Sequence, residues 1–149
     1  MRLTMTEPDT NTGYPQCVNM QMLRTSHFIM KAYDEAYRDL GVRATQTPVL
    51  GILARNKSAT IREIADEMES ERSVMSRKLQ VMEKNGWIEE SASGKEKTFA
   101  LTNAGRELME KVWPIRLEVQ TRLLGQLSKT EQDLLFNLCD KLKAAEAQQ

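Results

Sequence analysis

Apolar residues recur at helical spacing in the first part of the chain. Between residues 17 and 40 they return every three or four positions, as on one face of a helix, and Gly41 is a typical stop signal. Pro48 suits the first turn of a second helix, and a short apolar run follows it. We therefore expect a long helix over 17–40 and a short apolar helix that ends near Asn56.

The next segment predicts two short amphipathic helices joined by a tight turn. Thr60 and Glu63 form a capping box ahead of an apolar stripe, which indicates a helix over 61–68. Ser70 is expected to cap a second helix that ends at Gly86. The buried stripe of this second helix consists of Met75, Leu79 and Met82. Two short helices joined in this way predict a helix-turn-helix.

A short hairpin follows this pair of helices. Trp87 and Ile88 begin one strand, Ser93 and Gly94 supply the turn, and apolar positions over 98–101 form the returning strand. A helix-turn-helix followed at once by a hairpin is a winged helix.

Two further helices are expected after the hairpin. Thr102 is predicted to cap a long helix that begins at Asn103, and Pro114 is expected to kink that helix. Ser128 and Glu131 form another capping box, which opens the last helix. The order of elements predicts a mainly α (α+β) fold with a winged helix-turn-helix between two helical regions.

The second helix of the pair carries the side chains that reading DNA requires. In a helix-turn-helix this helix enters the major groove, and its early residues meet base edges. The face opposite the buried stripe offers guanidinium, hydroxyl, amide and methyl groups, which suit base edges. These residues are Arg72, Ser73, Val74, Ser76, Arg77 and Gln80. Lys95 and Lys97, near the hairpin tip, are candidates for phosphate or minor-groove contacts. The alternatives are an ordinary solvated helix surface and lysines that serve only solubility.

The terminal helices have more apolar positions than a monomeric winged helix needs. We therefore expect them to pack on a second copy, which would place two reading helices on a pseudo-palindromic site. An antiparallel pair within one chain is the alternative. The expected units are a flexible arm, an N-terminal dimerisation helix, a winged helix-turn-helix DNA-binding domain and C-terminal dimerisation helices, at residues 1–16, 17–40, 45–102 and 103–145.

Composition narrows the classes of function. The 149 residues include 21 basic and 21 acidic side chains, so a generally polycationic binder is excluded and any anion-binding surface is local. The sequence has no run of 18 apolar residues and no signal-peptide pattern at its start, so we expect a cytoplasmic protein with no membrane partner. Two cysteines and one histidine do not make a common metal site, and no catalytic motif is present. We expect no enzyme activity, no metal and no cofactor.

The ordered set of motifs resembles the MarR family of transcriptional regulators over roughly residues 17–145. The segments that carry this resemblance are GVRATQTPVLGIL, TIREIADEM, SERSVMSRKLQVMEKNGWIE, LTNAGRELME and LSKTEQDLLFNL. The resemblance implies a homodimer built from the terminal helices, DNA binding through the winged helices and a ligand pocket between these regions. It also implies DNA contacts at the six reading-helix residues, and at Lys95 and Lys97. The wing SASGKEKTF is shorter than is usual in the family and lacks the customary Asp-x-Arg of the tip.

Two features suggest how a signal is sensed. Cys17 begins the first helix, where the helix dipole stabilises a thiolate, so it is a candidate redox sensor; an inert thiol is the alternative. Some MarR relatives that sense hydroperoxides carry a reactive cysteine near this place. Cys139 is expected to lie in the core. The candidate effector-pocket residues are His27, Met30 and Trp113, with ordinary packing as the alternative.

The hypothesis is a homodimeric, cytoplasmic transcriptional repressor. It would bind double-stranded DNA at a pseudo-palindromic operator and be released by a small-molecule effector or an oxidant. The alternative is a winged-helix protein-interaction module that has no specific DNA binding.

Overall fold

The computed structural model of this chain describes residues 17–93 and 96–146. The expected N-terminal arm, at residues 1–16, and the wing residue Lys95 therefore lie outside the described residues. Within the described ranges, no helix is long and apolar enough to cross a membrane.

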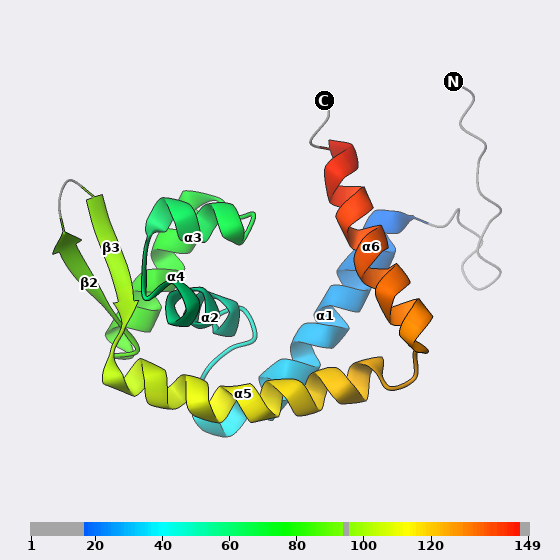
Figure 1. Cartoon of the computed structure of the whole chain (residues 1–149), viewed down its shortest axis with the longest axis horizontal. Coiled ribbons are helices and arrows are strands. Elements are labelled where there is room, and N and C mark those ends of the chain that lie inside the picture. Colours follow the sequence, from blue (N-terminus) through cyan, green and yellow to red (C-terminus); the bar gives the residue numbers. More distant parts are fainter. Residues whose placement is uncertain (1–16, 94–95, 147–149) are drawn as a thin grey trace.

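The longest helix, α5 (Asn103–Leu124), connects the two parts of the molecule. Figure 1 shows the winged helix beside its N-terminal half, and α1 (Val18–Ala36) and α6 (Lys129–Glu146) beside its C-terminal half. A single 3-10 turn, Arg38–Leu40, follows α1 and leads toward the winged helix. The two termini of the described chain thus lie on the side of the molecule away from the wing (Figure 1).

The winged helix is built from three helices and a small sheet. The helices are α2 (Thr47–Asn56), α3 (Ile61–Glu67) and α4 (Arg72–Lys84). The strands are β1 (Ser58–Thr60), β2 (Ile88–Ser93) and β3 (Glu96–Leu101). The sheet is antiparallel in the order β1-β3-β2, with Ala59 opposite Phe99 and Ile88 opposite Leu101. The hairpin was predicted from the sequence, whereas the three-residue strand β1 was not.

The hydrophobic core lies within the winged helix and the adjoining part of α5. The predicted α4 stripe is fully buried there, together with apolar residues of α2, α3 and the sheet. The largest buried side chains are Tyr37, Leu50, Leu53, Ile64, Met75, Leu79, Met82 and Ile88. None of the residues of α1 is buried, so this helix adds no side chain to the fully buried core.

The predicted helix caps are largely confirmed. Thr60 Oγ1 accepts a hydrogen bond from Glu63 N (3.2 Å), and Thr60 N donates one to the Glu63 carboxylate (2.7 Å), which completes the capping box. These bonds hold the pKa of Glu63 below its ordinary value, and Ser128 lowers the pKa of Glu131 in the same way. Thr102 accepts from Gly105 N and so caps α5 as predicted.

Two helix boundaries differ from prediction. The helix expected over 17–40 ends at Ala36, because Tyr37 turns into the core and is only 1% exposed. The Asp34 carboxylate accepts a hydrogen bond from Ala44 N (2.7 Å), which folds the following segment back against the end of α1. Gly41 has a φ of 67° and ends the 3-10 turn, so it is a stop signal for that turn.

Ser70 does not cap the second helix of the pair. Its amide donates to the Ala65 carbonyl and so belongs to the turn that closes α3, and Glu71 is the cap residue of α4. Glu69, with a φ of 48°, makes the sharp turn between the two helices. Pro114 lies inside α5, which is continuous through it, and the predicted kink stays a prediction.

Candidate nucleic-acid interface

Helix α4 separates a buried face from an exposed one as the sequence predicts. Met75, Leu79 and Met82 are at most 1% exposed. Arg72, Ser73, Val74, Arg77 and Gln80 are exposed on the other side, and Ser76 is half-buried. All six predicted reading-helix residues therefore lie on one helix, with five of them open to a partner.

The cations on this exposed face are available for an external anion. Within the described residues, neither Arg72 nor Arg77 belongs to an ion pair. Lys78, beside Arg77, is half-buried, and this burial lowers the pKa of its ammonium group. The guanidinium groups can form two parallel hydrogen bonds to guanine or to phosphate, which a lysine cannot do.

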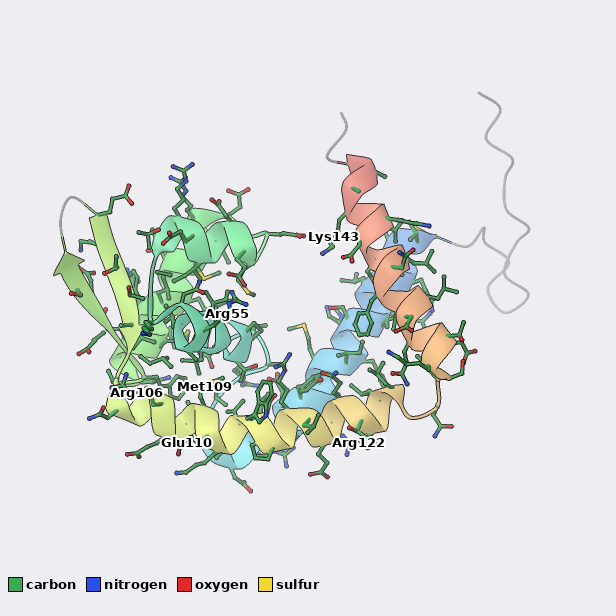
Figure 2. All side chains as sticks on the ribbon, viewed as in Figure 1. Arg55, Arg106, Met109, Glu110, Arg122 and Lys143 are labelled. Atoms are coloured by element: carbon green, nitrogen blue, oxygen red, sulfur yellow. The ribbon has the colours of Figure 1, made fainter. Side chains whose placement is uncertain are left out.

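Contacts on both sides of α4 fix its orientation. Before the start of α4, Arg55 of α2 forms an ion pair with Glu67 at the end of α3. This pair links the first helix of the helix-turn-helix to α2. Figure 2 shows Arg55 on α2 above the start of α5. At the end of α4, Gly86 has a φ of 76°, and its carbonyl accepts a hydrogen bond from Thr102 Oγ1 (2.6 Å).

The join between α4 and α5 is closely packed. Thr102 N donates to the Trp87 carbonyl (3.1 Å), and a side chain at Gly105 would meet the same carbonyl. A rotation of the first turn of α5 therefore moves the end of the reading helix with it.

Lys97, in the described part of the wing, forms an ion pair. Lys97 Nζ lies 2.9 Å from Glu90 Oε1 and 3.1 Å from Glu90 Oε2 across the hairpin. The hydrogen bond and charge of Glu90 raise the pKa of Lys97, and the charge of Glu83 on α4 adds to this. Glu90 was not among the predicted site residues, because its partner lies on the neighbouring strand and the pairing depends on the hairpin register.

Comparison with known proteins finds similarity to one family. The sequence model of the MarR family matches residues 40–97, which include α2, the helix-turn-helix and most of the wing. A crystal structure of the M. tuberculosis transcriptional regulator MosR in complex with DNA is 26% identical in sequence, with a TM-score of 0.78. The match covers 89% of this chain and 98% of MosR.

Residues 40–97 match the MarR family, and the similar structures support a MarR-family winged helix. The chain has the winged-helix fold of these transcriptional regulators, as the motifs in its sequence suggested.

Two further structures support the same fold. A MarR/EmrR family transcriptional regulator from Acinetobacter sp. ADP1 has a TM-score of 0.80 and 23% identity, over 88% of this chain and 95% of that one. S. aureus MepR, in a complex with DNA, has a TM-score of 0.77 and 21% identity, over 87% of this chain and 96% of MepR. No curated protein sequence matches this chain significantly.

The candidate effector-pocket residues line three separate cavities. His27 and Met30 of α1 line one cavity of about 660 Å³ beside the α1–α2 segment. Trp113 of α5 lines two others, of about 490 Å³ and 810 Å³, on the side where α5 meets α2. Within one copy of the chain, His27 and Met30 therefore line a different cavity from Trp113, and their part in an effector pocket stays a prediction.

The two cysteines differ in exposure. Cys17 is exposed immediately before α1, and it forms no side-chain cap on that helix. Cys139 of α6 is half-buried and not part of the core, contrary to expectation, because α6 packs less closely than a core helix. The described residues hold no cluster of three or more possible metal ligands.

Proposed function

We propose that this protein is a homodimeric repressor of the MarR family that binds a pseudo-palindromic DNA operator through α4. The observation that carries the proposal is the exposed face of α4, where unpaired arginines, hydroxyls and an amide lie opposite a fully buried stripe. The structures of MosR and MepR in complexes with DNA support it from outside this chain.

The exposed apolar residues of the terminal helices support a second copy as the partner. Phe28 of α1 is 75% exposed and Phe136 of α6 is 55% exposed, although both are large apolar side chains. Around them α1, α5 and α6 expose Val18, Met20, Met22, Leu23, Ile29, Leu117, Leu134, Leu135, Leu138 and Leu142. Apolar area on this scale in a folded monomer marks an interface. A two-fold dimer would place the two α4 helices about 34–36 Å apart on one side of DNA.

A cavity between α2 and α5 is the proposed effector site. Trp113 is 58% exposed there, and Arg116 lies over its ring at 5.2 Å, so an apolar, planar compound would find an aromatic wall. Met109 lies between α5 and α2 (Figure 2) and lines the cavity with Trp113. A ligand that separates α5 from α2 would turn α4, because Thr102 links the start of α5 to the end of α4.

Oxidant release is the second form of the proposal, and it rests on Cys17. The thiol is exposed immediately before α1, where a peroxide in solution can reach it. Cys17→Ser should leave DNA binding unchanged and abolish release by peroxide. Peroxide-driven release that persists in this variant would remove Cys17 from the proposal.

The test of DNA reading is Arg77→Ala, with Arg122→Ala as the matched control. Arg77 lies on the exposed face of α4, whereas Arg122 is exposed near the far end of α5 (Figure 2). If Arg77 reads a base, its loss should weaken binding to a selected duplex by about 1–3 kcal/mol and relax specificity at one position. Arg122→Ala should bind like the wild type. If Arg77→Ala binds the selected duplex and the other duplexes with the affinities of the wild type, the proposal that Arg77 reads a base is contradicted.

A winged-helix protein-interaction module is the second candidate function. The acidic wing residues Glu89, Glu90 and Glu96 favour it, because they oppose contact with phosphate on that part of the surface. Such a module would bind DNA weakly, lose that binding with moderate salt and select no sequence.

A further inference from the structure

The described part of the wing is acidic in a protein proposed to bind DNA. The described parts of β2 and β3 carry three carboxylates, Glu89, Glu90 and Glu96, and one cation, Lys97. On α4, by contrast, Arg72 and Arg77 belong to no ion pair within the ranges that the structure describes. Among the described residues, the reading helix therefore offers two arginines to phosphate, while Lys97 of the wing is engaged by its own hairpin.

The hairpin register explains how Glu90 reaches Lys97. Glu90 is opposite Phe99, and Lys97 is two residues from Phe99 along the same strand, so both side chains lie on the same face of the sheet. Both carboxylate oxygens of Glu90 approach Lys97 Nζ, at 2.9 Å and 3.1 Å. The Glu90 side chain is 31% exposed, whereas that of Lys97 is 72% exposed. The carboxylate is the more fixed partner, and the flexible lysine is the one drawn to it.

We propose that Glu90 is a positioning residue that holds the Lys97 ammonium against the wing and withholds it from the phosphate backbone of bound DNA. This inference rests on the proposed DNA-binding function. Each cation that neutralises a phosphate adds sequence-independent affinity, and such contacts carry no sequence information. Because Lys97 is paired within the wing, it adds no sequence-independent affinity, and binding depends more on the contacts of α4 with base edges. Removing the Glu90 charge would let Lys97 swing toward DNA.

Glu89 provides a matched control for this test. It is the next residue on β2, it is also exposed, and it points to the opposite face of the sheet. Within the described residues Glu89 belongs to no ion pair. Glu89→Gln removes the same charge from the wing as Glu90→Gln does, but it leaves the Lys97 pair intact.

The experiment measures fluorescence anisotropy of a labelled mixed-sequence duplex with the full chain, over a series of salt concentrations. Glu90→Gln should bind the duplex more tightly than the wild type and steepen the slope of log K against log salt by about 0.9. Its gain in affinity over the wild type should therefore fall about threefold between 50 and 200 mM salt. Glu89→Gln should tighten binding less and with a smaller change of slope. Lys97→Met should keep the wild-type slope, and the double variant Glu90→Gln/Lys97→Met should lose most of the gain.

Three results would overturn the inference. Equal salt slopes for Glu90→Gln and Glu89→Gln would reduce Glu90 to a general repulsive charge. A gain that persists in full in the double variant would show that Lys97 does not supply it. If Lys97→Met alone makes the slope of log K against log salt shallower by about 0.9, Lys97 already contacts phosphate in the wild type. This result does not depend on whether the Glu90 variants fold.

Failure of the proposed function looks different. If the wild type shows no binding, or binding that Arg77→Ala leaves unchanged, the DNA-reading proposal falls and this inference falls with it. If the wild type binds in an Arg77-dependent way and Glu90→Gln does not change the slope, only the role of Glu90 is overturned.

Discussion

Gly105→Ala is the most direct test of the packed join between α4 and α5. Gly105 is buried in the first turn of α5, and an added Cβ would overlap the Trp87 carbonyl oxygen. The same Cβ would lie 3.0 Å from the Trp87 carbonyl carbon and 3.3 Å from Leu101 Cδ2. The obstacle is backbone, so it cannot move aside as a flexible side chain would. Relief requires a shift of the α5 start relative to the end of α4.

Two unfavourable contributions and one favourable contribution set the cost of this shift in the free energy of unfolding. Overpacking of a well-packed site costs about 1–3 kcal/mol. The Trp87 carbonyl also accepts the Thr102 amide hydrogen bond (3.1 Å), and weakening that bond adds about 1 kcal/mol. Alanine is the better helix former by up to about 1 kcal/mol, which offsets part of the cost. The net prediction is a loss of about 1–3 kcal/mol in the free energy of unfolding, from these same ranges.

Gly51→Ala is the matched control, because Gly51 also lies inside a helix, and a Cβ there would have no atom within 4 Å beyond its chain neighbours and the backbone of its own helix. This variant should be as stable as the wild type or more stable, by up to about 1 kcal/mol. Urea unfolding followed by circular dichroism at one fixed protein concentration measures both variants, since a dimer's stability depends on concentration. Gly105→Ala with wild-type stability would refute the account of this join.

Three further predictions concern the caps and the exposed apolar faces. Thr60→Ala should lower the unfolding free energy by about 1 kcal/mol in urea unfolding, because it removes the capping box of α3, and an unchanged midpoint would contradict this. The pKa of Glu63 is lowered in the folded state, so its contribution to stability is present above its unfolded pKa and is lost as pH falls through its folded pKa; the loss of stability on acidification should be smaller in Glu63→Gln. Phe28→Glu, on the exposed apolar face of α1, should shift the protein from dimer to monomer in analytical ultracentrifugation, whereas a monomeric wild type would remove the dimer from the account.

Local patterns were sufficient to predict most of the winged helix. The Thr60–Glu63 box and the Thr102 cap depend on residues three positions apart, so the sequence alone contains their geometry. The α4 stripe was likewise predicted correctly, because three methionine and leucine side chains at helical spacing must share one face. The exposed opposite face followed directly from this assignment.

The features that were missed depend on contacts between distant segments. Strand β1 has only three residues, and it exists because Ala59 pairs with Phe99 of β3, forty residues along the chain. The early end of α1 depends on burial of Tyr37 and on the bond from Ala44 N to Asp34. His27 and Trp113 line different cavities, because different helices place them.

Selection from a random duplex pool tests the central claim most directly. The wild-type protein is bound to the pool at two salt concentrations, and the recovered sequences are re-measured by fluorescence anisotropy. The account predicts an enriched inverted repeat with half-sites about one DNA turn apart, bound more weakly by Arg77→Ala. Weak binding that disappears with added salt and enriches no motif would contradict the account and favour the interaction module.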